Sequence, residues 1–471
     1  MAVAPRNPSS LLGIDCGSAF TKVALIERVE GRYRVIARGS ARTTLDTHIL
    51  DGVSRACSEI EWLTGRRLFA QGQLISGDVS GNRGVEAVAA SLTCQPPLQL
   101  LVTDAATAAA AARGPCQVTL LARGAISERL AQAQSSRWDA LAGGADEIAA
   151  LAHLLEGDPA GTVRRTGLFD APRLISGDSA SIERQVQALA LEHAARGIPG
   201  YAELSAACTE PLVTGADALA RLTGLIAGRF KLRLAIVDCG ASTVMASVAT
   251  PDDLPELKRR VCRPPGIPLT DDDLSLAQLA TESAIHALIA GLSVDLLVGT
   301  GAIFSSAPRP AQAGLMLLNG ARPRGVVQLA CDMAGVLSQL AALAVYWPDA
   351  AAAAMEADGL VGLGTAICPR GSGQAGRKAL DVSFSIGDEP TVTRAFNIGE
   401  LGRVALAPGQ QAKLQLFPAG SLDVGLGQNG AAASTTVDGG AIGLMVDARL
   451  GQTSGSSSRD AWLQALEARP L

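Results

Sequence analysis

The chain has 471 residues, of which 48% are hydrophobic, 18% charged and 3% aromatic, and its formal net charge is −5. This composition is typical of globular domains, and the length suits about three domains of roughly 150 residues. A net negative chain gives no sign of a surface for polyanions, so nucleic-acid binding is not expected. The low aromatic content predicts aliphatic cores.

Targeting signals are not evident in the sequence. The longest apolar stretch, 333–347, is shorter than the roughly 20 residues that a membrane span requires, and a buried helix explains it better. The first ten residues, MAVAPRNPSS, lack the apolar core of a secretory signal, so a cytoplasmic protein is expected. Nine cysteines, an odd number without a C-x-x-C pair, indicate free thiols in a reducing compartment.

The first predicted elements form a hairpin. Residues 11–26, LLGIDCGSAFTKVALI, are an apolar run that breaks at Asp15-Cys16-Gly17-Ser18 and then resumes, which predicts two strands with these residues at the tip. Strands and helices alternate after it, which indicates α/β layering. Two of the turns, before Asp146 and at Asp178, open helices with an acid in the first turn or at the cap.

A second unit is predicted from residue 206. Its hairpin, LAIVDCGASTVMASVA at 234–249, repeats the Asp-Cys-Gly tip at Asp238, and the later strand VDLLVGTGAIF ends in a Gly-Thr-Gly turn. A long helix is predicted from about Val327 to Tyr346. The predicted domains are therefore 1–205 and 206–372, followed by an all-β module at 376–452 and, at 453–471, a flexible tail with a short helix.

The hairpin tips have the chemistry of a phosphate site. Glycine and small neighbours let backbone N–H groups approach phosphate oxygens closely. An acid at the same tip, Asp15, can hold hydrated Mg²⁺, and Lys22 on the departing strand can turn toward the same anion. Two such tips could clamp a polyphosphate between two domains. The Gly-Thr-Gly turn at 299–301 suits the close approach of a flat ligand.

These stretches also resemble a known superfamily. GIDCGSAFTK is similar to the first phosphate motif of the actin-like ATPases, VDCGAST to the second, and VGTGAIF to the adenosine motif. DCGSAFTKVAL, DALAGGAD, VDCGASTVMASVA, VGTGAIFSSAP and GAIGLMVDARLG resemble, more narrowly, the glutamate mutase accessory protein family (MutL or GlmL). The resemblance covers most of the chain. It implies an α/β fold of duplicated actin-like, ribonuclease H-like domains around a nucleotide cleft, plus the C-terminal all-β module.

The resemblance also implies cofactors, partners and site residues. ATP and Mg²⁺ are the expected cofactors, and the subunits of an adenosylcobalamin-dependent mutase are the expected partner. Asp15 and Asp238 would be the acids that face the metal, and Asp146 a further catalytic candidate. The remaining ligand contacts would come from small and polar residues of the three motifs, namely Gly17, Ser18, Thr21, Lys22, Gly240, Ser242, Thr243, Gly299, Thr300 and Gly301.

The sequence departs from the family pattern at two places. Met245 stands where the second phosphate motif usually has an acid, and GGADEIA lacks the two glycines that usually follow its aspartate. Phosphoryl transfer normally needs a group that orients the attacking water. Asp146 and Asp178 are the candidates, and each is also explained as a helix-terminal acid. Slow hydrolysis, or binding without hydrolysis, follows from these departures.

Three functions are compatible with these residues. The first is a chaperone-like or reactivating ATP-binding accessory factor that acts by nucleotide-driven domain closure. The second is an actin-like scaffold of the cytoskeletal or pilus type, and the third is a small-molecule kinase on the same fold. The four histidines do not occur in the D-x-H-x-x-G pattern of cobalamin binding, so a cobalamin site in this chain is disfavoured.

Overall fold

The chain forms two compact units in the computed structural model. The structure describes residues 7–77, 81–94, 97–121, 124, 126–135, 138–156, 173–253, 255–261, 270–451 and 456–467. Unit 1 comprises Met1–Leu222, Glu256–Arg259 and Ser338–Ala354, and unit 2 comprises Thr223–Pro255, Arg260–Leu337 and Met355–Leu471. The division differs from the predicted one at residues 205 and 206, because unit 1 extends to Leu222 and also takes in two later segments.

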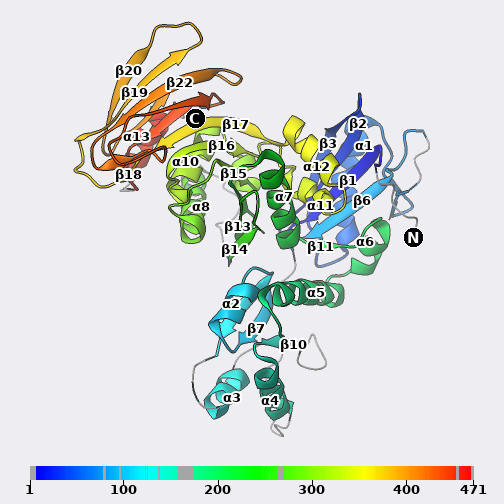
Figure 1. The fold of residues 1–471 in the computed structure, drawn as a ribbon. Helices are drawn as coiled ribbons and strands as arrows, with labels where there is room; N and C mark the ends of the chain where they lie inside the picture. Colours follow the sequence, from blue (N-terminus) through cyan, green and yellow to red (C-terminus); the bar gives the residue numbers. More distant parts are fainter. Residues whose placement is uncertain are drawn as a thin grey trace. The chain divides into compact units, whose positions relative to one another are not determined.

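The central sheet of unit 1 has five strands in the order β11-β6-β1-β2-β3 (Figure 1). Strands β1 to β3 form an antiparallel meander, whereas β6 runs parallel to β1, and β11 parallel to β6. One face packs against helix α1 through buried aliphatic side chains such as Ile14, Val23 and Val53. The elements are β1 (Ser10–Cys16), β2 (Phe20–Val29), β3 (Arg32–Arg42), α1 (Ile49–Thr64), β6 (Ala87–Leu92) and β11 (Val213–Thr214).

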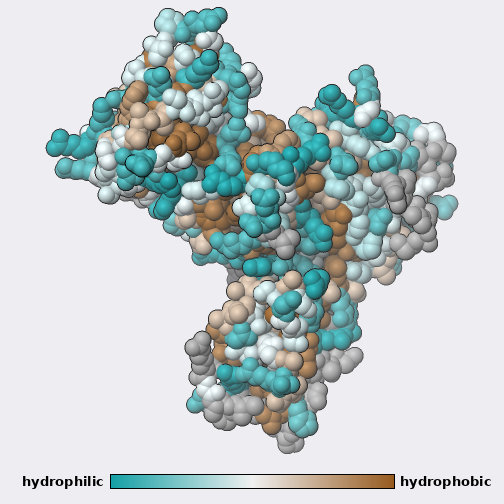
Figure 2. All heavy atoms as spheres, viewed as in Figure 1, coloured by the Kyte–Doolittle hydropathy of each residue, from teal (hydrophilic) through white to brown (hydrophobic). Residues whose placement is uncertain are grey.

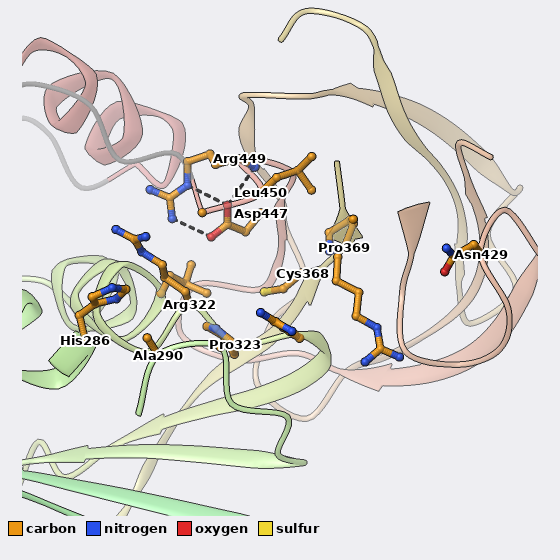
Figure 3. A pocket seen from close by; sticks show the side chains of 16 residues that line it. His286, Ala290, Arg322, Pro323, Cys368, Pro369, Asn429, Asp447, Arg449 and Leu450 are labelled. Atoms are coloured by element: carbon orange, nitrogen blue, oxygen red, sulfur yellow. Dashed lines mark hydrogen bonds and ion pairs between the residues drawn. The ribbon is translucent and has the colours of Figure 1, made fainter. Parts of the chain in front are cut away.

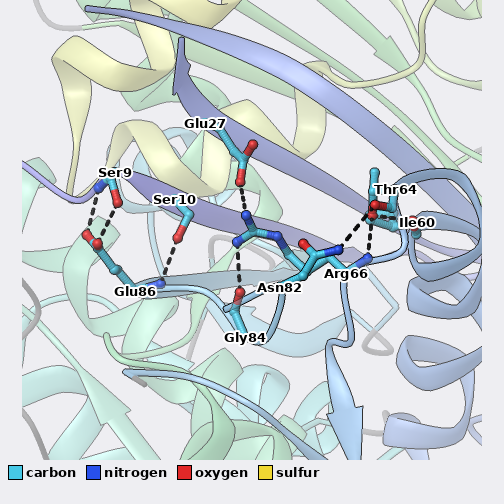
Figure 4. Close-up of polar contacts among 9 residues, drawn as sticks. All are labelled: Ser9, Ser10, Glu27, Ile60, Thr64, Arg66, Asn82, Gly84 and Glu86. Carbon is cyan, nitrogen blue, oxygen red and sulfur yellow. Dashed lines mark hydrogen bonds and ion pairs between the residues drawn. The ribbon is translucent and has the colours of Figure 1, made fainter. Parts of the chain in front are cut away.

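Polar contacts fasten the beginning of β1, at the opposite end from the hairpin tip (Figure 4). The Ser10 hydroxyl accepts a hydrogen bond from the backbone N–H of Glu86 at 3.1 Å, next to β6. Arg66, just after α1, forms an ion pair with Glu27 of β2 and donates to the carbonyl of Gly84 at 3.0 Å. These contacts join β1, β2 and the loop before β6, so the strands that carry the first hairpin are held at their far end.

A second sheet of unit 1 is inserted between β6 and β11. Its four strands are all parallel, in the order β10-β9-β7-β8. Gln187 of α5 accepts a hydrogen bond from Thr214 of β11, so this helix reaches the central sheet. The inserted elements are β7 (Leu98–Val102), α2 (Ala105–Ala111), β8 (Cys116–Leu120), α3 (Ile126–Ser135), β9 (Ala140–Ala142), α4 (Ala145–Glu156), β10 (Arg173–Ile175) and α5 (Ser179–Gly197).

The remaining elements of unit 1 are short strands and helices. Helix α7 begins in unit 1 and ends in unit 2, because the division falls after Leu222. The elements are β4 (Phe69–Ala70), β5 (Gln73–Leu74), α6 (Tyr201–Ala207), α7 (Gly215–Phe230), α11 (Leu337–Ala344) and α12 (Pro348–Ala354).

Unit 2 is built on an eight-stranded sheet in the order β14-β13-β12-β15-β16-β17-β25-β21. Its first five strands repeat the order of the central sheet of unit 1: β12 pairs antiparallel with β13 and parallel with β15, and β15 pairs parallel with β16. The repeat confirms the predicted duplication. The elements are β12 (Leu234–Cys239), β13 (Thr243–Ala249), β14 (Glu256–Val261), α8 (Asp271–Ile289), β15 (Leu296–Thr300), α9 (Ala302–Ser305), α10 (Pro310–Ala321), β16 (Gly325–Cys331), the π-helix η1 (Met355–Gly359) and β17 (Val361–Cys368).

The C-terminal part of unit 2 is rich in strands, as predicted, but it does not stand apart from the main sheet (Figure 1). Four strands form the antiparallel sheet β20-β19-β22-β24, whereas β21 and β25 extend the eight-stranded sheet. Strand β22 alternates strictly between exposed and buried residues, as a sheet with one solvated face requires. The elements are β18 (Arg370–Gly371), β19 (Lys378–Ile386), β20 (Val392–Asn397), β21 (Leu401–Val404), β22 (Gln411–Pro418), β23 (Leu422–Asp423), β24 (Ala433–Asp438), β25 (Leu444–Asp447) and α13 (Ser456–Ala465).

One element of the sequence prediction is wrong. The helix expected from Val327 to Tyr346 is instead strand β16, a turn that contains Asp332, and then helix α11. The run was misread because strand and helix are both largely buried, and a nearly continuous apolar run does not reveal its period. The correction matters for the site, because polar residues of this turn and of the first turn of α11 contact the motif residues.

The short helix predicted near the C-terminus is α13, and it packs against unit 2 rather than standing free. Arg459 pairs with Glu282 of α8, and both side chains are buried. The second oxygen of Glu282 accepts from Asn319 of α10 at 3.1 Å, and Arg459 also donates to Gln278 at 2.8 Å. Leu463 belongs to the main core of the unit. The predicted linker at 453–455 lies outside the described residues.

The described residues also show what kind of surface and thiols the chain has. In the part of the chain that the structure describes, no helix is both long and apolar enough to cross a bilayer. The face drawn in Figure 2 is a mosaic of hydrophilic and hydrophobic residues. The eight cysteines that the structure describes are buried and free, and burial raises the pKa of Cys57, Cys94, Cys116, Cys208 and Cys331 far above neutral pH.

We expect Arg459→Met to destabilise unit 2 by about 3–5 kcal/mol, because it leaves the Glu282 carboxylate buried without its cation. Burial already raises the pKa of Glu282, against the lowering effect of Arg459. The loss should therefore be larger at pH 7 than at pH 5, where more of the carboxyl is protonated. Urea unfolding at both pH values measures it, and the double variant with Glu282→Gln should recover stability. A single-variant loss of the same size at both pH values would contradict this account.

Candidate functional site

The turn of the first hairpin is built around a glycine, Gly17. Gly17 lies between β1 and β2, and its N–H donates to the carbonyl of Phe20 at 3.0 Å. The Thr43 hydroxyl donates to the carbonyl of Gly17 at 2.7 Å, which fixes the turn from the side. A Cβ atom at Gly17 would lie 2.6 Å from the Phe20 carbonyl, so a side chain there would distort the tip. The turn therefore presents main chain, with half-buried Ser18 beside it.

Asp15 is a buried carboxylate at the end of β1. Only 6% of its surface is exposed, and its Oδ1 atom accepts hydrogen bonds from Thr93 at 3.1 Å and from Ser91 at 3.3 Å. Burial raises the pKa of the Asp15 carboxyl above its ordinary value. Lys22 and the hydroxyls of Ser338, Thr93 and Ser91 act in the opposite direction without cancelling the effect of burial. The ionised form of the Asp15 carboxyl is thus energetically unfavourable in the fold, as is often the case for carboxylates at functional sites.

Lys22 and Thr21 lie on opposite faces of β2. Lys22 is the register partner of Asp15, so both side chains project from the same face of the sheet, and the lysine is half-buried. Thr21 is fully buried on the other face, where its hydroxyl lies 3.1 Å from that of Thr43. Lys22 therefore lies on the same face of the sheet as Asp15, whereas Thr21 hydrogen-bonds to Thr43 on the opposite face.

The second hairpin has the same closure in unit 2. The N–H of Gly240 donates to the carbonyl of Thr243 at 2.9 Å, three residues on, as at the first tip. Asp238 is half-buried and pairs in register with Met245, whose side chain is buried. Met245 occupies the position that Lys22 has in the first hairpin. The repeat therefore keeps the acid and the glycine but replaces the cation with an apolar side chain.

The Gly-Thr-Gly turn lies directly against the second tip. Thr300, the last residue of β15, pairs in register with Asp238 of β12. Gly301 has a φ of 100°, and a Cβ atom there would lie 2.2 Å from the carbonyl oxygen of Cys239. Only glycine fits both conditions. Gly299 is equally restricted, because its Cβ atom would meet the ring of Phe304. In unit 2 the structure thus brings the second phosphate motif and the adenosine motif together.

Asp332 is a site residue that the sequence analysis missed. It follows β16, is 1% exposed, and accepts hydrogen bonds from the Thr300 hydroxyl at 2.8 Å and from the N–H groups of Val336 and Leu337 at 3.0 and 2.9 Å. Its own N–H donates to the carbonyl of Gly299 at 2.9 Å. Asp332 therefore holds the Gly-Thr-Gly turn from behind. An aspartate directly after a buried strand, with a glycine three residues on, was the available signal.

Helix α11 supplies a second group that was missed. The hydroxyl of Ser338, in its first turn, acts on Asp15 by lowering the pKa of that carboxyl, and it donates a hydrogen bond to Oε1 of Gln339 at 3.0 Å. The neighbouring Gln339 allows almost no space above β1: a Cβ atom at Gly13 would lie 2.6 Å from its carbonyl oxygen. Gly13 therefore permits the close packing that brings Ser338 to the acid.

The two candidates for orienting water lie elsewhere in unit 1. Asp146 is exposed in the first turn of α4, next to the inserted sheet rather than in the sheet of Asp15. Asp178 is the N-cap of α5, where it accepts from the N–H of Ser181 at 2.7 Å. This bond gives Asp178 a structural role. The catalytic role of Asp146 stays a prediction.

The carboxylate of Asp15 is the kind of group that serves as a ligand of a magnesium ion. Mg²⁺ commonly uses one or two carboxylates, several waters and ligand phosphates. The pKa of Asp15 stays raised despite Lys22 and three hydroxyls, so a further cation would stabilise its ionised form. Among the described residues, no group of three or more histidine, cysteine, aspartate or glutamate side chains is placed to hold a metal ion.

Comparison with known proteins supports the family resemblance in one part of the chain. The model of the family described as MutL protein matches residues 11–155, which include the first hairpin and much of the inserted sheet. The predicted resemblance to this family is confirmed over those residues. No curated protein matches the chain.

Solved structures with similar folds are distant. The ethanolamine utilization protein EutJ from Carboxydothermus hydrogenoformans is 10% identical, with 73% of this chain and 91% of that one covered and a TM-score of 0.29. A Bacteroides thetaiotaomicron protein described as having an actin-like ATPase fold is 7% identical over 72% and 96%, with a TM-score of 0.28. The type II variant of the Aquifex aeolicus Ppx/GppA phosphatase is 11% identical over 75% and 94%, with a TM-score of 0.24.

The predicted fold class is confirmed by the architecture itself. The chain is a mixed α/β protein in which two units repeat one strand order and a strand-rich C-terminal part follows.

We expect Asp15→Asn to stabilise unit 1 at neutral pH, because it removes the penalty for burying an ionised carboxyl. The raised folded pKa means that the wild type loses stability, relative to the variant, as the pH rises from the unfolded pKa of about 3.9 to the folded value. Each unit of elevation corresponds to about 1.4 kcal/mol. Thermal unfolding from pH 3.5 to pH 8 measures this difference.

Asp104→Asn is the control, because its effect on stability at neutral pH should have the opposite sign to that of Asp15→Asn. Hydrogen bonds from Thr107 lower the pKa of Asp104, the N-cap of α2, so its ionised form contributes stability above pH 4 that is lost on acidification. An Asp15→Asn variant that is less stable than the wild type at pH 7 would contradict the interpretation of Asp15.

Proposed function

We propose that the chain is an ATP-binding accessory factor, chaperone-like or reactivating, of an adenosylcobalamin-dependent mutase of the glutamate mutase type, and that it works in the cytoplasm. The observation that carries the nucleotide part is the repeated hairpin: in each unit an aspartate ends a strand and a glycine N–H closes the turn three residues on. The mutase part rests on the MutL family match at residues 11–155.

In this proposal the two tips hold the phosphates of MgATP and the Gly-Thr-Gly turn approaches the nucleoside. Backbone N–H groups at Gly17 and Gly240 contact phosphate oxygens, with help from the nearby hydroxyls of Ser18, Ser242 and Thr243. Lys22 neutralises phosphate charge, as lysine does in other phosphate cradles. Asp15 and Asp238 hold Mg²⁺, which would shield the phosphate charge.

The proposed roles of Lys22 and Mg²⁺ follow from the difference between the two hairpins. Without a ligand, the charge of Lys22 acts on Asp15 and partly offsets the burial of that carboxyl. A bound Mg²⁺ ion would take over this task, and Lys22 would then be available to phosphate. The second tip has Met245 in the same position and supplies no cation. Because Met245 also replaces an expected acid, we propose slow hydrolysis or binding without hydrolysis.

We expect MgATP to bind the wild type, and Lys22→Met and Asp15→Ala each to weaken binding by about tenfold or more. Lys22→Met is the sharper variant, because it gives the first hairpin the residue that the second carries at the same position. Isothermal titration calorimetry measures the effect, with Lys413→Met, an exposed lysine of β22, as control. Unchanged affinity in both site variants would refute the nucleotide part of the proposal.

Binding of MgATP to both units should bring them together, and closure of this kind is how nucleotides drive many accessory proteins. We expect the radius of gyration from small-angle scattering to fall when MgATP is added to the wild type and to stay constant for Lys22→Met. The expected change is one of domain closure, without a change in mass. No compaction under saturating MgATP would refute closure while leaving nucleotide binding intact.

A further inference from the structure

Unit 2 contains a cavity that the nucleotide motifs do not use. Its volume is about 550 Å³, within the range of about 300–1,000 Å³ that small-molecule sites occupy. The ends of α8, α10, β17 and β25 surround it (Figure 3). Its lining shares no residue with the two hairpins or the Gly-Thr-Gly turn.

The lining of this cavity is strongly positive. Arg322, Arg324, Arg370 and Arg449 line it, whereas Asp447 is its one lining acid. Asp447 binds Arg449 at both oxygens, at 2.8 and 2.7 Å (Figure 3). Arg370 is paired with Asp423, outside the lining, and the balance stays positive even when this acid is counted. The whole chain has a net charge of −5, so the concentration of arginines here is local.

The arginines are not needed to satisfy the helix ends around the cavity. Arg322 ends α10 with a φ of 43°, and its backbone N–H already donates to the carbonyl of Leu318. The carbonyl of Ala321 accepts from the N–H of Gly291, and that of Gly320 lies 3.3 Å from Nδ1 of His286. The last carbonyls of α10 thus have partners from backbone and histidine. Arg449 and Arg370 are paired with acids, so the positive charge that exceeds the acids comes from Arg322 and Arg324.

The side chain of Arg449, on one side of the cavity, is held in place by several contacts. Its side chain is buried, stacks on Trp462 at 4.3 Å and donates to Asn319 at 2.7 Å, besides binding Asp447. This arginine belongs to the stretch GAIGLMVDARLG, which the nucleotide site does not involve. The stretch therefore shapes the cavity.

We propose that this cavity binds a compact polyanion that carries phosphate or carboxylate groups. Planar guanidinium groups bind both anions through paired hydrogen bonds. The lining contains no phenylalanine, tyrosine or tryptophan, and the imidazole of His286 is its one aromatic ring. This proposal goes beyond the nucleotide role and does not depend on it.

The test is calorimetric titration of the metal-free full chain, in the presence of EDTA, with sodium pyrophosphate and separately with citrate at equal ionic strength. Arg322→Gln and Arg324→Gln should each weaken binding by about tenfold or more. Asn429→Asp, which adds a negative charge at an exposed lining position, should weaken it without removing a contact from the fold. Preference for one probe distinguishes a phosphate ligand from a carboxylate ligand.

Two variants separate this site from the rest of the chain. Arg377→Gln alters an exposed arginine of unit 2 outside the lining, and Lys22→Met alters the proposed nucleotide site. Both should bind the probe with wild-type affinity. Three results would overturn the proposal. They are no binding of either anion to the wild type, wild-type affinity in all three cavity variants, and a loss of binding in Lys22→Met alone.

Discussion

The burial of one carboxylate, Asp15, constrains the architecture of unit 1 around the first hairpin. A charge with 6% exposure needs partners, and they come from three separate segments: Lys22 across the hairpin, Ser91 and Thr93 at the end of β6, and Ser338 at the start of α11. Their combined effect does not restore the ordinary pKa. The fold therefore retains a carboxyl whose ionised form is unfavourable beside a glycine tip, and perturbed groups of this kind cluster at functional sites.

Comparison of the two hairpins shows which features the duplication keeps. The turn closure and the aspartate recur, because both depend on backbone geometry and on the last position of a central strand. The facing residue differs: Lys22 is half-buried, whereas Met245 is buried. An apolar side chain opposite Asp238 can neither neutralise phosphate nor orient water. In the proposed nucleotide site, this asymmetry would leave charge compensation to unit 1, while unit 2 would contribute backbone and the Gly-Thr-Gly turn.

Much of this arrangement could be predicted from local sequence. Hairpin tips and the Gly-Thr-Gly turn depend on residues next to one another in the chain, so apolar runs broken by Asp and Gly were sufficient to locate them. Asp332 and Ser338 were missed because strand β16 and helix α11 are both buried, and their sequences merged into one predicted helix. The membership of β21 and β25 in the main sheet depends on long-range pairing, which composition does not encode.

The missed segment also connects the two sets of motif residues along the chain. Asp332 fixes Thr300 and the N–H groups of Val336 and Leu337 within unit 2. The next residue, Ser338, belongs to unit 1, and its hydroxyl lowers the pKa of Asp15. Six positions of the chain thus separate the acid that fixes the Gly-Thr-Gly turn from the hydroxyl that lowers the pKa of Asp15.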